Sequence, residues 1–229
     1  MLKAAIFDAY GTLLDVNSAT RRLVQSDRYP KLAAHEAQLS AIWRTKQLHY
    51  SWLRALMGAY VPFWQCTSDA LDYALADTGL DGDSALRDDL LALYRKIDAY
   101  DDAKRLLQDL TDVPTAILSN GNHDMLRDAT HSAGIDSYLD KILSVEDVGI
   151  FKPSRHVYQL GCDAFGVKPD EVLFFSSNGW DIAGARHFGY RTIWVNRTGQ
   201  TQEVLGDGPH HIVCDLDEAG QLAHDFLKM

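Results

Sequence analysis

The sequence is poor in cysteine and in positive charge, and it has no long hydrophobic run. Its three cysteines are widely spaced and lack a C-x-x-C pair, which argues against a disulfide framework and favours reduced thiols in a cytoplasmic protein. The formal net charge of -10 argues against nucleic acid and anionic membrane surfaces as partners. No apolar run reaches the length of a membrane span, and no signal-peptide pattern opens the chain, so we expect a protein that neither enters a membrane nor is exported.

Apolar runs alternate with helical patterns over most of the chain, in which 46% of the residues are hydrophobic. Short runs bounded by turn-type residues predict buried strands, and the stretches between them carry apolar residues at helical spacing. This alternation predicts an α/β fold with a Rossmann-like, doubly wound parallel sheet. The expected strands span residues 2–7, 115–118, 141–144, 172–175, 192–195 and, more weakly, 211–213. The expected helices of this part span residues 101–110, 124–133, 154–165, 181–188 and 215–228.

Residues 15–97 follow a different pattern, because strand signals vanish and apolar residues recur at helical spacing in four separate runs. We therefore expect an inserted bundle of about four helices. The insertion leaves after the first strand and returns before the helix at 101–110. Residues 1–14 together with 98–229 form the expected core domain, and residues 15–97 form the expected helical cap domain.

Polar residues follow three of the expected strands at the point where each strand ends. These are Asp8, the pair Ser119-Asn120, and the triplet at residues 176–178. In an open parallel sheet, ligands bind beyond the carboxyl ends of the strands. The three regions are therefore expected to meet at one edge of the sheet, where the helical insertion can cover them.

Asp8 is the candidate nucleophile, because it ends an apolar strand and is followed closely by Gly11-Thr12. A carboxylate in this position can attack a saturated carbon, expel a leaving group and form an ester that water then hydrolyses. An aspartate after a strand is also a common turn or helix cap. The polar residues that follow the other strands favour the catalytic interpretation.

Two cations are candidates for binding an anion beside Asp8. Lys152 can orient Asp8 and offset its repulsion of an anionic substrate, which amounts to roughly 4 kcal/mol for two charges a few ångström apart at an intermediate dielectric. Arg44 lies on an otherwise apolar helical stretch and can reach from the insertion into the site, where its guanidinium suits a halide or a carboxylate. Both residues also fit the commoner state of a solvated surface cation.

Six motifs together resemble those of the L-2-haloacid dehalogenases, a metal-independent branch of the haloacid dehalogenase superfamily. They are F-D-A-Y-G-T-L-L-D, W-R-T-K-Q-L-x-Y-S-W-L-R, L-S-N-G, F-K-P, S-S-N-G-W-D and V-N-R-T-G. The resemblance covers residues 2 to about 199 and implies a Rossmann-like core with a helical-bundle cap. It implies hydrolysis of short L-2-haloalkanoic acids to D-2-hydroxy acids with inversion, through an ester on Asp8. It also implies an anionic haloacid and a halide ion as ligands, and a homodimer formed mainly through cap helices.

The resemblance assigns roles to residues of this chain, position by position. Asp8 matches the nucleophile, Arg44 the arginine that binds halide and substrate, and Lys152 the lysine beside the nucleophile. The rest of the implied catalytic network consists of Thr12, Ser119, Tyr158, Ser176, Asn178 and Asp181. The implied pocket wall and leaving-group contacts are Tyr10, Leu48, Phe63, Asn120 and Trp180.

Two carboxylates that magnesium-dependent phosphatases of this superfamily carry are absent. Tyr10 stands where those relatives have the acid that protonates the leaving group, and Ser176-Ser177 stands where they have Gly-Asp. Mg²⁺ requires oxygen ligands of this kind, so we expect no metal and no cofactor. A phenol does not protonate a leaving group at neutral pH, and a halide needs no proton. Activation of the hydrolytic water stays open among Asp181, Lys152 and Asn178.

Two alternatives belong to other classes of function. A magnesium-dependent phosphatase would release phosphate, which Tyr10 and the Ser-Ser pair argue against. A non-catalytic binding protein on this fold would show no turnover, and the presence of both Arg44 and Lys152 argues against it. Thr45 stands where many relatives carry a glutamine that lines the pocket, so the preferred substrate size stays open.

Overall fold

A six-stranded, entirely parallel sheet forms the centre of the computed structural model, which describes residues 2–228. The strand order is β3-β2-β1-β4-β5-β6. The strands are β1 (Ala4–Phe7), β2 (Thr115–Ser119), β3 (Lys141–Ser144), β4 (Val172–Ser176), β5 (Arg191–Val195) and β6 (His211–Val213). All six strands expected from the sequence are confirmed, and so is the Rossmann-like sheet.

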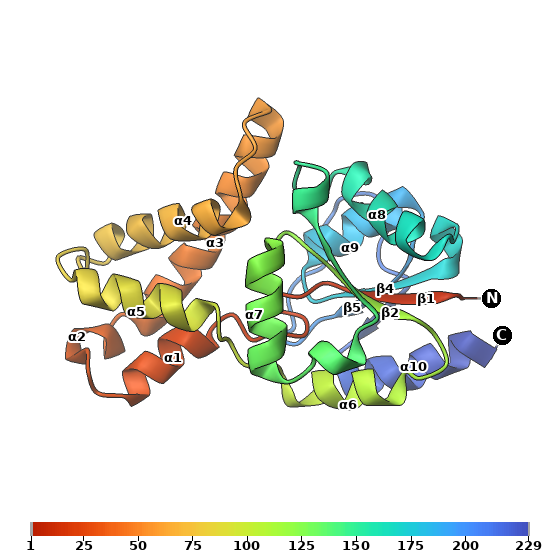
Figure 1. Ribbon diagram of the computed structural model, residues 1–229, viewed down its shortest axis with the longest axis horizontal. Helices are drawn as coiled ribbons and strands as arrows, with labels where there is room; N and C mark the ends of the chain where they lie inside the picture. Colours follow the sequence, from red (N-terminus) through yellow and green to blue (C-terminus); the bar gives the residue numbers. More distant parts are fainter. Residues whose placement is uncertain (1, 229) are drawn as a thin grey trace.

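Helices cover both faces of the sheet, which explains why its central strands are continuous apolar runs rather than alternating patterns. Every residue of β1, β2 and β4 is buried. In Figure 1, α6 and α10 lie together on one side of the sheet, and α8 and α9 lie on the other. These helices are α6 (Asp101–Asp109), α7 (His123–Ala133), α8 (Arg155–Phe165), α9 (Gly179–Phe188) and α10 (Leu216–Lys228). Short 3₁₀ helices span Asp136–Tyr138, Val145–Asp147 and Pro169–Glu171.

A group of helices between β1 and α6 forms the inserted bundle, which we call the helical cap and which lies beside the core in Figure 1. Its members are α1 (Ser18–Gln25), α2 (Pro30–Ala33), α3 (Glu36–Met57), α4 (Phe63–Asp77) and α5 (Ser84–Tyr94). The expectation of about four helices missed α1 and α2, which lack comparable apolar runs. Two of the four expected runs belong to one helix, α3, since no glycine or proline interrupts it before Gly58, whose φ of +65° ends the helix.

The two chain segments that join the cap to the core lie side by side. Leu14 forms an isolated antiparallel bridge with Ala99, and the Asp15 N–H donates to the carbonyl of Asp98 at 2.7 Å. The domain boundaries at residues 14 and 98 stay a prediction. No helix within residues 2–228 has both the length and the apolar character needed to cross a bilayer.

Candidate active site

Asp8 follows β1 directly and lies at the carboxyl edge of the sheet, with 5% of its surface exposed. The chain then turns through Gly11, whose φ of +92° is a conformation that only glycine adopts without strain. This turn returns Thr12 to Asp8, and the Thr12 hydroxyl donates to Asp8 Oδ2 at 3.1 Å. The same hydroxyl accepts from the Ser177 N–H at 2.8 Å, which fixes the direction in which it donates.

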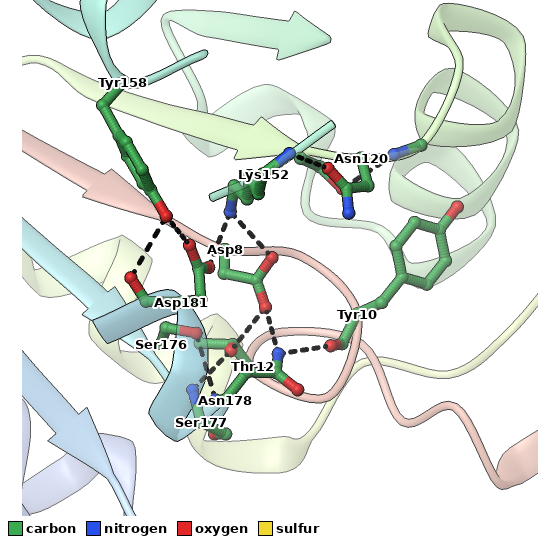
Figure 2. Close-up of polar contacts among 12 residues, drawn as sticks. Asp8, Tyr10, Thr12, Asn120, Lys152, Tyr158, Ser176, Ser177, Asn178 and Asp181 are labelled. Carbon is green, nitrogen blue, oxygen red and sulfur yellow. Dashed lines mark hydrogen bonds and ion pairs between the residues drawn. The ribbon is translucent and has the colours of Figure 1, made fainter. Parts of the chain in front are cut away.

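A buried ammonium group lies between two buried carboxylates (Figure 2). Lys152 Nζ donates to Asp8 Oδ1 at 3.1 Å and to Asp181 Oδ2 at 2.7 Å. Lys152 is 1% exposed and Asp181 is 0% exposed. The Tyr158 hydroxyl donates to the other Asp181 oxygen at 2.8 Å. Lys152 is therefore neither a solvated surface cation nor free to turn away from Asp8.

The charges of this cluster depend on a balance between burial and mutual attraction. Burial acts to lower the pKa of Lys152, but the negative charges of Asp181 and Asp8 outweigh it and raise the pKa, so the ammonium stays charged. Burial raises the pKa of Asp181 to about 6, with the charge of Lys152 opposing the rise and that of Asp8 adding to it. Burial also raises the pKa of Tyr158 well above its usual value, so its hydroxyl is a neutral donor.

Arg44 reaches from α3 of the cap to the core and is linked to Asp8 through a single amide. Asn178 Nδ2 donates to Asp8 Oδ2 at 2.8 Å, and Asn178 Oδ1 accepts from Arg44 Nη2 at 3.2 Å. Arg44 Nη2 also donates to the carbonyl oxygen of Tyr10 at 3.2 Å. Lys152 therefore contacts one oxygen of the Asp8 carboxylate directly, and Arg44 is linked to the other oxygen through Asn178.

Tyr10, two residues after Asp8, belongs to an aromatic cluster. Its ring stacks on Tyr94 of the cap at 5.7 Å between centroids and lies 6.4 Å from Phe63. Burial raises the pKa of Tyr10 well above its usual value, so this hydroxyl stays protonated at neutral pH. Within residues 2–228 the Tyr10 hydroxyl has no hydrogen-bond partner.

Three of the expected site residues fix the turns around Asp8 in this structure. The hydroxyl of Ser119 accepts from the Gly121 N–H at 3.1 Å, and that of Ser176 accepts from the Asn178 N–H at 3.1 Å. Asn120 Oδ1 accepts from the backbone N–H of Lys152 at 2.9 Å, as Figure 2 shows. These contacts place Lys152 and Asn178, which in turn contact Asp8 directly.

Three further residues named in the sequence analysis, Trp180, Leu48 and Thr45, lie on α9 and α3. Trp180, at the start of α9, packs edge-on against Trp52 of the cap with centroids 5.3 Å apart. Leu48 is half-buried on α3. Thr45 is exposed and lines a surface groove with Lys46, on the outer side of α3. The effect of Thr45 on the preferred substrate size stays open.

Gln47 is a site residue that the sequence interpretation missed. It is 1% exposed, lies three residues after Arg44 on α3, and accepts from Arg44 Nη1 at 3.0 Å. The available signal was a glutamine three residues after Arg44 in an expected helix, since residues three apart are neighbours on a helix. Within residues 2–228, no group of three or more His, Cys, Asp or Glu side chains is arranged to hold a metal ion.

A buried carboxylate, paired with an ammonium at the carboxyl edge of a Rossmann-like sheet and linked to a helical cap by hydrogen bonds, is the kind of site that a hydrolase with a carboxylate nucleophile requires. Residues 2–189 match the family of haloacid dehalogenase-like hydrolases, and the chain belongs to that family.

Several relatives cover nearly the whole chain. It is 44% identical to (S)-2-haloacid dehalogenase 1 of Pseudomonas sp. (strain CBS-3), over 96% of both chains. It is 45% identical to (S)-2-haloacid dehalogenase 4A of Burkholderia cepacia, over 95% of this chain and 93% of the relative. The solved structure of L-2-haloacid dehalogenase from Xanthobacter autotrophicus with chloropropionic acid covalently bound superposes with a TM-score of 0.90, at 36% identity over 98% of this chain and 99% of that one.

Proposed function

We propose that this protein hydrolyses the carbon–halogen bond of short-chain L-2-haloalkanoic acids and releases halide and a D-2-hydroxy acid. The observation that carries the proposal is the environment of Asp8. Lys152 pairs with this carboxylate, while the position that would protonate a phosphate-type leaving group is the neutral phenol of Tyr10. Relatives of 44% and 45% identity named (S)-2-haloacid dehalogenase support the same substrate class.

In the first step, an oxygen of Asp8 attacks C2 of the haloacid on the side opposite the halogen. The new carbon–oxygen bond forms as the carbon–halogen bond breaks, and the halide leaves with the bonding electron pair. Attack from the back inverts the carbon. The three donors to Asp8, from Thr12, Lys152 and Asn178, hold the carboxylate in one orientation. Arg44 supplies positive charge for the substrate carboxylate or the departing halide.

In the second step, water attacks the acyl carbon of the ester on Asp8, and the bond between that carbon and the substrate oxygen breaks, so C2 keeps its inverted configuration. The Asp8 carboxylate is restored, and the departing alkoxide takes up a proton and leaves as the hydroxy acid. One group must accept a proton from the attacking water. Three residues were left open for this role by the sequence. Lys152 has a raised pKa and stays an ammonium, and Asn178 carries a neutral amide. Asp181, with its pKa raised to about 6, is ionised at neutral pH and is the base among the three.

The test is halide release from L- and D-2-chloropropionate in the presence of EDTA. We expect release from the L-isomer only, unaffected by EDTA, and loss of turnover in Asp8→Asn, because an amide is a poor nucleophile. The control is Gln38→Glu, a change at an exposed position of α3, and we expect it to keep wild-type activity. Phosphate release from a phosphate ester that requires Mg²⁺, without halide release, would identify the protein as a phosphatase instead.

We also propose that two copies of the chain associate through the cap. Leu53, Leu56 and Met57 at the end of α3 are exposed, Leu56 by 85%. Trp52 of the same stretch faces Trp180 of the core instead. Exposed apolar groups of this kind are typical of association surfaces. Sedimentation should give a dimer for the wild type and a monomer for Leu56→Asp.

The domain boundaries and the cellular location complete the proposal. Residues 1–14 with 98–229 form a core domain, and residues 15–97 form a cap domain that unfolds as a unit. Hydrogen exchange in mild denaturant should show residues 15–97 exchanging at a common rate that differs from that of the core.

The three cysteines are free thiols, as in a cytoplasmic protein, and fractionation of the source cells tests that location.

A further inference from the structure

Arg44 differs from most arginines of this protein in having only neutral acceptors. Its guanidinium donates to Gln47 Oε1 at 3.0 Å, to the Tyr10 carbonyl at 3.2 Å and to Asn178 Oδ1 at 3.2 Å. By contrast, Arg197 and Lys152 are both paired with carboxylates. Among the described residues, no carboxylate lies within salt-bridge distance of Arg44. Its guanidinium is therefore held in one orientation by neutral acceptors and has no direct ion-pair partner.

Gln47 holds Arg44 in this state through a buried chain of hydrogen bonds. Its amide nitrogen donates to Thr67 Oγ1 at 2.8 Å and to the Tyr94 hydroxyl at 3.0 Å. Thr67 is itself anchored, since its hydroxyl donates to the carbonyl of Phe63 one turn earlier at 2.9 Å. With both donors of the amide occupied, the oxygen of Gln47 accepts from Arg44 at 3.0 Å, and the Tyr94 hydroxyl lies 3.3 Å from the same oxygen. The orientation of the amide is therefore determined by α4 and α5, not by Arg44 alone.

A glutamate would fit the same space and accept the same hydrogen bond, but it would neutralise Arg44. The Tyr94 hydroxyl can rotate to donate to a carboxylate, and the Thr67 hydroxyl can do so by giving up its bond to the Phe63 carbonyl. The choice between glutamine and glutamate at this position thus concerns charge, not shape.

We propose that Gln47 is a positioning residue for anion binding, which orients the Arg44 guanidinium while leaving its positive charge available to the substrate carboxylate or the leaving halide. This inference rests on the proposed function and goes beyond it by naming what keeps Arg44 free for an anion. Gln47 lies behind Arg44 and acts through it.

The test compares two near-isosteric variants that separate charge from contact. Gln47→Glu keeps the acceptor for Arg44 and adds a negative charge, whereas Gln47→Met removes all the hydrogen bonds of Gln47 without adding charge. We expect Gln47→Glu to raise the KM for L-2-chloropropionate and the inhibition constant of bromide by on the order of tenfold or more, as loss of one charge-assisted contact predicts. Gln47→Met should change both constants by less than Gln47→Glu does.

A purely structural role for Gln47 predicts the opposite order, because methionine leaves the buried Tyr94 hydroxyl without its partner. The inference is overturned if folded Gln47→Glu binds bromide like the wild type, or if Gln47→Met is the weaker binder. If Gln47→Glu fails to fold, a folded Gln47→Met that binds bromide like the wild type overturns the orienting role of Gln47. Gln38→Glu adds the same charge to an exposed site on α3 and should change neither constant.

Bromide binding is also measured without turnover, as the rise in melting temperature with bromide concentration. A wild-type protein that binds bromide but releases no halide from any haloacid would contradict the proposed function while leaving the role of Gln47 intact. A wild-type protein that turns over haloacids, with equal bromide stabilisation in Gln47→Glu, would contradict the role of Gln47 alone.

Discussion

Replacing Lys152 with methionine should destabilise the protein strongly at neutral pH, although the change conserves most of the side-chain volume. Lys152 Nζ contacts Asp8 at 3.1 Å and Asp181 at 2.7 Å, and all three side chains are buried. The variant leaves two buried carboxylates with no cation between them. The native state must then either hold two repelling charges or take up a proton.

The geometry sets the size of this effect. Two oxygens that contact the same nitrogen are at most about 6 Å apart, where two negative charges repel by about 3 kcal/mol at an effective dielectric of about 20. Breaking a buried ion pair by removing one partner costs about 3–5 kcal/mol. We therefore expect Lys152→Met to lower the free energy of unfolding by about 3–5 kcal/mol near pH 8.

The loss of unfolding free energy in Lys152→Met should shrink as the pH falls, because the native variant takes up a proton. Asp181 in the wild type has its pKa raised to about 6, and removal of Lys152 raises that pKa further. The native variant then binds a proton that the unfolded chain, with an ordinary aspartate pKa of about 3.9, does not bind, so its stability rises as the pH falls through the raised pKa. Between about pH 8 and pH 6, the free energy of unfolding of the variant should come closer to that of the wild type.

The assay is urea unfolding of the wild type, Lys152→Met and the double variant Lys152→Met/Asp181→Asn at several pH values. The double variant removes the repulsion, and the Tyr158 hydroxyl can still donate to the amide oxygen. It should recover about half of the lost stability and show less pH dependence. A single variant within about 1 kcal/mol of the wild type near pH 8, or a double variant no more stable than the single one, would refute the reasoning.

Three further predictions follow from the same structure. The rate of ester hydrolysis in single-turnover experiments should fall as the pH drops through about 6, because Asp181 must be ionised to accept a proton; a flat profile would exclude it as the base. Arg197→Met should lower the free energy of unfolding by about 2 kcal/mol or more in urea, since Asp102 would lose both of its contacts with the guanidinium, at 2.7 and 3.0 Å. Gly184→Ala should destabilise by about 1–3 kcal/mol, because the new Cβ would lie 2.5 Å from the Tyr158 hydroxyl; an unchanged melting temperature would contradict this.

The strands of the core could be predicted from the sequence because their burial on both faces leaves a local signature. Covered strands must be apolar throughout, and each one ends where turn-type residues begin, so Asp8 and the residues after β2 and β4 were recognisable as the ends of strands. Arg44 and Lys152 were found through their motifs. The length of α3 was not predicted, since polar residues within a continuous helix interrupt an apolar run without ending the helix.

Contacts between distant parts of the chain depend on the strand order, which no local pattern encodes. The tertiary structure alone places β1 between β2 and β4, so that Asp8 lies between the turns at residues 119–121 and 176–178. It also decides that Asp181 holds Lys152, and that Gln47 orients Arg44 without neutralising it. The sequence by itself determined which residue types are available for chemistry and where each strand ends. Only packing decided their partners and charges, because burial and distance, not residue type, set the energy of a hydrogen bond or an ion pair.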